Sequence, residues 1–181
     1  MRLIILGLDQ GLDVSWYANP EYNHFEMGQI KLGLEKNLDV SWYANPKFNA
    51  NQMQEIRFGL EKGLNISIYA NPKFNENQLY EIRRGLEKNL DVSIYADTKY
   101  KFEQMQQIRF GLEKSIDVSW YANPEFEWKQ MKQIRLGLEE GLDVSYYTNS
   151  KITIYGIVEI KNALSKGNIK EVNNILDSIF S

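Results

Sequence analysis

Apolar and polar positions recur along this chain with a fixed period of 26 residues. Tyrosine returns in one phase and leucine in another, with no insertion or deletion between copies. The tyrosines are Tyr17, Tyr43, Tyr69, Tyr95, Tyr121 and Tyr147, and the leucines are Leu8, Leu34, Leu60, Leu86, Leu112 and Leu138. A fixed period of this length predicts a protein built of stacked repeats.

The first part of each repeat has the spacing of a helix. In one copy the apolar positions follow a period of 3.6 residues, and Asn49 with Gln52 has the spacing of a capping box. The apolar positions of this copy are Met53, Ile56 and Leu60. The position after the segment is Gly11, Asn37, Gly63, Asn89, Ser115 or Gly141 in successive copies. Gly and Asn tolerate the left-handed conformation that ends a helix, so a helix is predicted over about residues 50–62 and over the matching copies.

The second part is shorter and covers Val14–Ala18 in the first copy. Asp13 stands where an N-cap is expected and Pro20 prevents a helix from continuing, which predicts a short α or 3₁₀ turn. The alternative is a strand, because Val, Trp and Tyr favour sheets, and a strand with a helix in each repeat would form an α/β leucine-rich-repeat-like horseshoe. The capping residues favour the turn.

These elements predict an all-α fold, a right-handed solenoid of long-helix and short-helix repeats with terminal caps. We expect a single repeat domain over residues 1–181. Within it, residues 1–20 would form an N-terminal cap and partial repeat, residues 21–150 five repeats, and residues 151–181 a diverged repeat and a C-terminal helical cap.

A glycine recurs inside the long helix, at Gly33, Gly59, Gly85, Gly111 and Gly137. Glycine in a helix costs about 1 kcal/mol relative to alanine. Because the position lies on the core side, the close approach of a neighbouring backbone is the expected reason, and recent duplication of the repeat is the alternative.

A basic residue also recurs on the long helix, four residues before a glutamate. The basic residues are Lys31, Arg57, Arg83, Arg109, Arg135 and Lys161, and the glutamates are Glu35, Glu61, Glu87, Glu113 and Glu139. The spacing predicts a solvated ladder of ion pairs. The alternative is a row of phosphate contacts that would act with the tryptophans in a single-stranded nucleic-acid binding module.

Composition limits the chemistry that we expect. A net charge of -3 does not suit a protein that coats DNA, and the lack of cysteine excludes disulfides and suggests a cytoplasmic protein. No apolar run is long enough to span a membrane, and the first residues lack the cleavage pattern of a signal peptide. The aspartates of the short turns are expected to cap them and not to bind Ca²⁺, and His24 has no catalytic partner. We therefore expect no enzyme activity, no cofactor and no metal site.

The copies differ from one another along one stripe of the long helix. In a helical projection, positions 50, 54 and 58 and their copies lie opposite the core side. The stripe contains Phe58, Tyr80, Arg84, Phe102, Phe110, Trp128, Lys132 and Leu136. A second varied column on the short turn, which includes Trp42 and Trp120, is expected to share this surface. Exposed aromatic residues on one face indicate a protein interface, and the alternatives are that the stripe belongs to the core or closes a homodimer.

Units of the form Q-M-x-x-I-R-x-G-L-E-x-G-L-D-V-S-x-Y-A-N-P-x-F, as in Gln52 to Phe74, resemble tandem repeats of hypothetical proteins in Firmicutes phages and mobile elements. The resemblance covers about residues 1–166 and implies no activity of the repeat itself. It implies that the gene lies in a phage or mobile element. Such elements encode small proteins that disable host immune machinery, anti-CRISPR proteins among them. We therefore expect a non-enzymatic scaffold that binds a host protein or protein complex through the stripe and inhibits host defence. The alternative is the nucleic-acid binding module.

Overall fold

The computed structural model describes residues 2–181, and these residues form α-helices and 3₁₀ turns with no strand among them. The all-α prediction is therefore confirmed, and the α/β horseshoe is wrong. The α-helices are α1 (Arg2–Asp9), α2 (His24–Glu35), α3 (Ala50–Glu61), α4 (Glu76–Leu86), α5 (Phe102–Glu113), α6 (Trp128–Glu139), α7 (Ile154–Ser165) and α8 (Ile169–Phe180). The 3₁₀ turns are η1 (Val14–Trp16), η2 (Val40–Trp42), η3 (Ile66–Ile68), η4 (Val92–Ile94), η5 (Val118–Trp120) and η6 (Val144–Tyr146).

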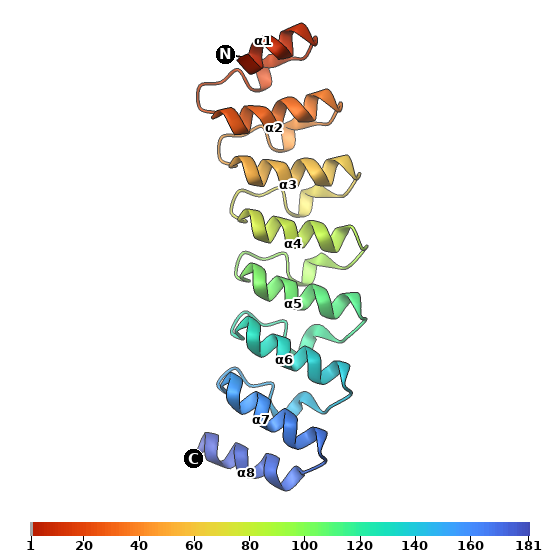
Figure 1. Cartoon of the computed structure of the whole chain (residues 1–181), viewed down its shortest axis with the longest axis vertical. Coiled ribbons are helices and arrows are strands. Elements are labelled where there is room, and N and C mark those ends of the chain that lie inside the picture. The colour runs from red at the N-terminus through yellow and green to blue at the C-terminus, as the bar shows by residue number, and fades with distance from the viewer. Residues whose placement is uncertain (1) are drawn as a thin grey trace. The chain divides into compact units, whose positions relative to one another are not determined.

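The chain forms two compact units, Met1–Asn89 with α1 to α4 and Leu90–Ser181 with α5 to α8. In the first unit α1 packs on α2, α2 on α3 and α3 on α4, and in the second α5 packs on α6, α6 on α7 and α7 on α8. Within each unit, consecutive long helices lie side by side and the 3₁₀ turns form a second layer behind them (Figure 1). This is the stacking expected of a solenoid of repeats. The handedness of the solenoid stays a prediction.

The long helices begin and end as the sequence predicts. In α3 the side chain of Asn49 accepts a hydrogen bond from the amide of Gln52 at 2.9 Å, and Gln52 Oε1 accepts one from the amide of Asn49 at 2.8 Å. After the helices, Gly63 has a φ of 66°, Asn37 of 54° and Ser115 of 56°. In α2, α3 and α4 a capping box and a left-handed residue thus enclose the helix between two local signals.

Each 3₁₀ turn begins at an acidic or amide side chain. Asp39 Oδ1 accepts hydrogen bonds from the amide and the hydroxyl of Ser41, at 3.1 and 2.5 Å, and Asn65 holds Ser67 in the same way. The aspartates therefore cap the turns, as predicted.

The glycine inside the long helix makes room for a tyrosine hydroxyl. Tyr43, fully buried, donates a hydrogen bond from its hydroxyl to the carbonyl of Gln29 at 3.2 Å, and a Cβ on Gly33 would overlap that hydroxyl. The same overlap recurs between these pairs: Gly7 and Tyr17, Gly59 and Tyr69, Gly111 and Tyr121, and Gly137 and Tyr147. The predicted approach of a neighbouring backbone is therefore wrong, because the group that approaches is a side chain.

The last elements depart from the repeat. α7 follows the phase of a long helix, but α8 replaces the 3₁₀ turn after it and packs its buried Val172 towards α7. The amphipathic segment predicted over residues 171–180 lies within α8. Among residues 2–181, no helix combines the length and the apolar character that a membrane span requires.

Candidate binding surface

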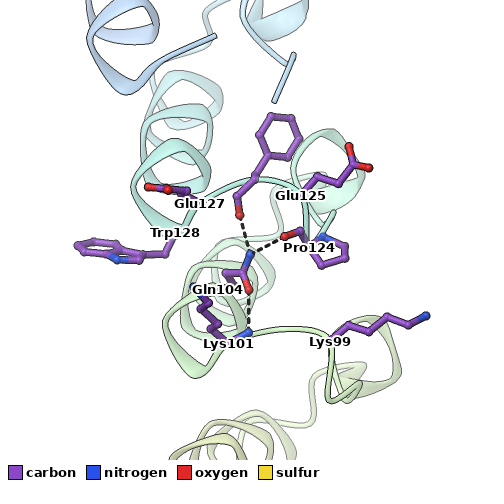
Figure 2. Close-up of a pocket in the computed structure, with 8 residues that line it drawn as sticks. Lys99, Lys101, Gln104, Pro124, Glu125, Glu127 and Trp128 are labelled. Carbon is purple, nitrogen blue, oxygen red and sulfur yellow. Dashed lines mark hydrogen bonds between the residues drawn. The ribbon is translucent and has the colours of Figure 1, made fainter. Parts of the chain in front are cut away.

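The glutamines of three capping boxes, Gln52, Gln104 and Gln130, also join their repeats to the next one. In the second unit, Gln104 Oε1 accepts a hydrogen bond from the amide of Lys101 at 2.7 Å. Its Nε2 donates to the carbonyls of Pro124 and Phe126, at 3.0 and 2.5 Å (Figure 2). Gln52 makes the same bonds to Pro72 and Phe74, and Gln130 to Ser150 and Ile152. Sequence reasoning predicted the cap but missed the link between repeats.

Around Gln104 lies an open pocket of about 380 Å³, formed where α5 and α6 begin. The side-chain amide of Gln104 in this pocket already makes its hydrogen bonds within the protein. The groups that remain for a partner are charged side chains at the rim, such as Lys99 and Glu125, and the Trp128 ring, which points away from Gln104 (Figure 2). The pocket therefore contributes an aromatic edge to a binding surface and shows no constellation for catalysis.

The basic row forms the predicted ion pairs, but it is buried. Lys31 pairs with Glu35, Arg57 with Glu61, Arg83 with Glu87, Arg109 with Glu113, and Arg135 with Glu139. Only 6–9% of the surface of each arginine side chain is exposed. The expectation of a solvated ladder is therefore wrong, because packing of the neighbouring helix covers these side chains.

Three of the buried arginines also reach a neighbouring helix. Arg57 Nε donates to Gln29 Oε1 at 3.1 Å, and Arg83 Nε to Glu55 Oε2 at 2.8 Å. In the second unit Arg135 Nε donates to Gln107 Oε1 at 3.3 Å. Because these guanidinium groups are enclosed and their hydrogen bonds are internal, they form no cationic surface for phosphates, and the nucleic-acid hypothesis loses the residues on which it rested.

The glutamates of this network have lowered pKa values. Burial alone would raise the pKa of Glu87, but the hydrogen bond from Lys62 and the positive charge of Arg83 outweigh it and lower the pKa. The pKa values of Glu61 and Glu139 are lowered by the same balance, with Lys36 and Lys114 in the place of Lys62. These carboxylates therefore stay charged well below neutral pH.

Aromatic residues of the stripe cover the ion pairs. The Phe58 ring lies 4.7 Å from the guanidinium of Arg57 and 5.5 Å from that of Arg83. In the second unit Phe110 lies 4.7 Å from Arg109 and 5.6 Å from Arg135. Tyr80 stacks in the same way on Arg83 and Arg84. Part of the stripe therefore stabilises the fold through cation–π contacts.

The stripe is nevertheless at the surface and not in the core. Tyr80, Trp128 and Lys132 are exposed, and the rest of its members are half-buried: Phe58, Arg84, Phe102, Phe110 and Leu136. By contrast, the constant positions Met53 and Ile56 are fully buried. The alternative that placed the stripe in the core is wrong for these residues.

The second varied column lies on a different layer from the stripe. Gly33 faces the 3₁₀ layer, and the stripe lies on the far side of the long helix from this glycine position. Trp42 and Trp120 are exposed on the 3₁₀ turns η2 and η5. Trp42 and Trp120 therefore lie on the layer that the glycine faces, and the expectation that both columns share one surface stays a prediction.

No protein-family model, curated protein or solved structure matches this chain. Among residues 2–181, no three side chains of His, Cys, Asp or Glu gather as a metal site would require.

Proposed function

We propose that this chain is a scaffold that binds a protein partner through the stripe of its long helices. One observation carries the proposal: on the long helices the positions that vary most between repeats are exposed or half-buried, while constant positions such as Met53 and Ile56 are fully buried. In the second unit these varied positions hold Phe102, Phe110, Trp128 and Leu136 beside Lys132. Aromatic and aliphatic side chains gathered at a surface are typical of protein interfaces.

The resemblance of the repeat to those of phages and mobile elements supports a further part of the proposal, that the partner belongs to a host defence system and is inhibited by binding. This part adds no residue to the interface. Expression of the chain in host cells would then raise the plating efficiency of a phage that the defence system restricts. Unchanged plating in cells that produce the folded protein would count against an inhibitor.

The interface is best tested by photo-crosslinking. A benzoylphenylalanine placed at Trp128 would react with a stripe partner, whereas the same group at Trp120 would sample the 3₁₀ layer of the same unit. We expect a nuclease-resistant protein adduct from position 128 and none from position 120. Adducts from position 120 alone would move the interface to the other layer, and adducts that nuclease removes would restore the nucleic-acid alternative.

A charge change gives a matched control for the same experiment. Lys132→Glu alters the stripe, and Lys170→Glu makes the same change at an exposed position of α8 in the same unit. We expect Lys132→Glu to reduce recovery of the partner at least about fivefold, and Lys170→Glu to leave it unchanged, since rim charges of an interface act locally. Equal effects of the two variants would contradict a stripe interface.

A further inference from the structure

The first helix, α1, has an apolar edge that is not covered within residues 2–181. On this edge Ile5 and Leu8 are 53% and 60% exposed. The copies of Leu8 in α2 and α3 are Leu34 and Leu60. Both are half-buried, because the preceding helix of the unit covers part of their surface. The edge of α1 therefore exposes the side on which the other helices of this unit receive a neighbour.

Residue 5 differs in kind from its copies. Every later copy is a lysine or arginine, and in α3 and α4 this cation reaches back to the preceding helix, as Arg57 does to Gln29 and Arg83 to Glu55. Ile5 has no group that could donate such a hydrogen bond. At this position the edge of α1 therefore lacks the cation that links α3 and α4 to their preceding helices, and it offers an apolar side chain instead.

The two ends of this edge carry opposite charges. Arg2 begins α1 and Asp9 ends it, both are exposed, and with Ile5 they have the i, i+3, i+7 spacing of one helix side. When two copies of α1 lie antiparallel around a twofold axis, Arg2 of each copy faces Asp9 of the other, and the apolar residues between them meet. The helix dipoles are then antiparallel as well, which is the favourable arrangement.

We propose that α1 joins two copies of this chain in a twofold, antiparallel dimer. The surface is complementary to itself, because its opposite charges face each other across the twofold axis and its apolar residues meet. An isologous interface requires such self-complementarity. The inference does not depend on the proposed function, because α1 contains none of the partner-binding residues named above. An interface centred on one helix of 8 residues is small, so the dimer should exchange with monomer on dilution.

The outward side of α8 does not fit this edge, which disfavours a head-to-tail filament. Opposite the buried Val172, α8 exposes Lys170, Asn174 and Asp177. These polar groups would lose their hydration against Ile5 and Leu8 without gaining hydrogen bonds. A closed dimer is therefore the assembly that the two surfaces support.

Sedimentation velocity over about a hundredfold range of protein concentration tests the proposal. We expect the wild-type chain to pass from monomer to dimer, and Ile5→Glu to raise the dissociation constant at least about tenfold. Ile68→Glu changes an isoleucine on η3 of the same unit that is 40% exposed, and this matched control should dimerise as wild type does. A wild-type chain that stays monomeric, or a dimer that survives Ile5→Glu, would overturn the proposal.

A charge exchange tests the antiparallel geometry separately. Arg2→Asp and Asp9→Arg each place like charges opposite one another, and each should weaken the dimer about tenfold, whereas the double variant restores the opposite pairs and should recover the wild-type dissociation constant. Circular dichroism confirms that each variant is folded. A double variant that is weaker than either single variant would exclude the antiparallel arrangement.

Discussion

The hydroxyl of Tyr43 occupies the place that a side chain on Gly33 would need. This tyrosine comes from the 3₁₀ layer, passes through the core and ends at the helix backbone, where it donates to Gln29 at 3.2 Å. The contact ties the two layers of a repeat together, and its dependence on a missing side chain makes it directly testable.

Gly33→Ala should destabilise the protein, while Gly28→Ala in the same helix should stabilise it. A Cβ at residue 33 meets the Tyr43 hydroxyl, and overpacking of this kind costs about 1–3 kcal/mol, more than the roughly 1 kcal/mol that alanine gains in helix propensity. A Cβ at residue 28 meets nothing within 4 Å, so only the gain remains. Urea unfolding measures both free energies.

The same series contains its own cross-check. Tyr43→Phe removes the hydroxyl that Gly33→Ala would strike, so the double variant should be more stable than the sum of the single effects predicts. Strict additivity would mean that the hydroxyl is not the group that excludes the side chain.

Arg83→Met should destabilise the protein far more than Arg84→Met does. The Arg83 side chain is 8% exposed and pairs with Glu55 and Glu87, so its loss leaves two carboxylates with one partner fewer, which costs about 3–5 kcal/mol. Arg84, next in the chain, is 40% exposed and pairs with Glu87 at 3.1 Å, and its loss should cost less than about 1 kcal/mol. Chemical denaturation of both variants gives the comparison, and equal losses would contradict a buried network.

Acid should weaken the fold through the glutamates of this network. Their pKa values are lowered in the folded protein: that of Glu35 by the hydrogen bond from Lys31, and that of Glu87 by Lys62 and Arg83 against the effect of burial. A carboxyl group whose folded pKa lies below its ordinary value of 4.5 stabilises the fold above that value and loses this effect as the pH falls through the folded pKa. The melting temperature should therefore be level near neutral pH and fall below about pH 4.5.

Circular dichroism melts across this pH range check the prediction. Arg83→Met should show a shallower fall than wild type, because Glu87 loses one of the charges that lower its pKa. A melting temperature that rises on acidification would contradict the sign of the effect.

Gln52→Glu should destabilise the protein, and the opposite change at the matching position of α2, Glu26→Gln, should stabilise it. A glutamate keeps the capping bond, as Glu26 does to the amide of Asn23 at 2.9 Å, but it has no amide to donate to the carbonyls of the next repeat. Each change should be worth about 1 kcal/mol in the free energy of unfolding, with opposite signs. Two effects of the same sign would show that the link between repeats adds nothing to the cap.

Much of the fold was predictable because its signals are local. Asn49 with Gln52, Asp39 with Ser41, and the left-handed Gly63 act within a few residues of chain, so spacing alone identified the helices and the turns. The burial of Arg57 was not predictable, since its covering groups come from Gln29 on the neighbouring helix and from the Phe58 ring, and the i, i+4 spacing to Glu61 is the same in a solvated pair. The role of Gly33 depended likewise on the path of Tyr43 through the core.

The position of the stripe opposite the core was predictable, but the degree to which each of its side chains is exposed was not. Its variation is visible in the sequence, whereas its exposure depends on how deeply each helix is enclosed by its neighbours. Phe58 and Phe110 show why, because each is both a varied residue and the cover of two arginines.

The bonds that join neighbouring repeats span only 20 to 28 residues, from Gln52 to Pro72 and from Gln29 to Arg57. Removal of residues 47–72 would put Arg83 at the place of Arg57, next to Gln29. Gln29 already accepts a hydrogen bond from Arg57, so it could accept the same bond from Arg83 at the new junction. In-frame recombination between copies could therefore lengthen or shorten the gene by whole repeats without redesign of the joints. The number of varied side chains offered to a partner would then be set by unequal crossing-over as well as by point mutation.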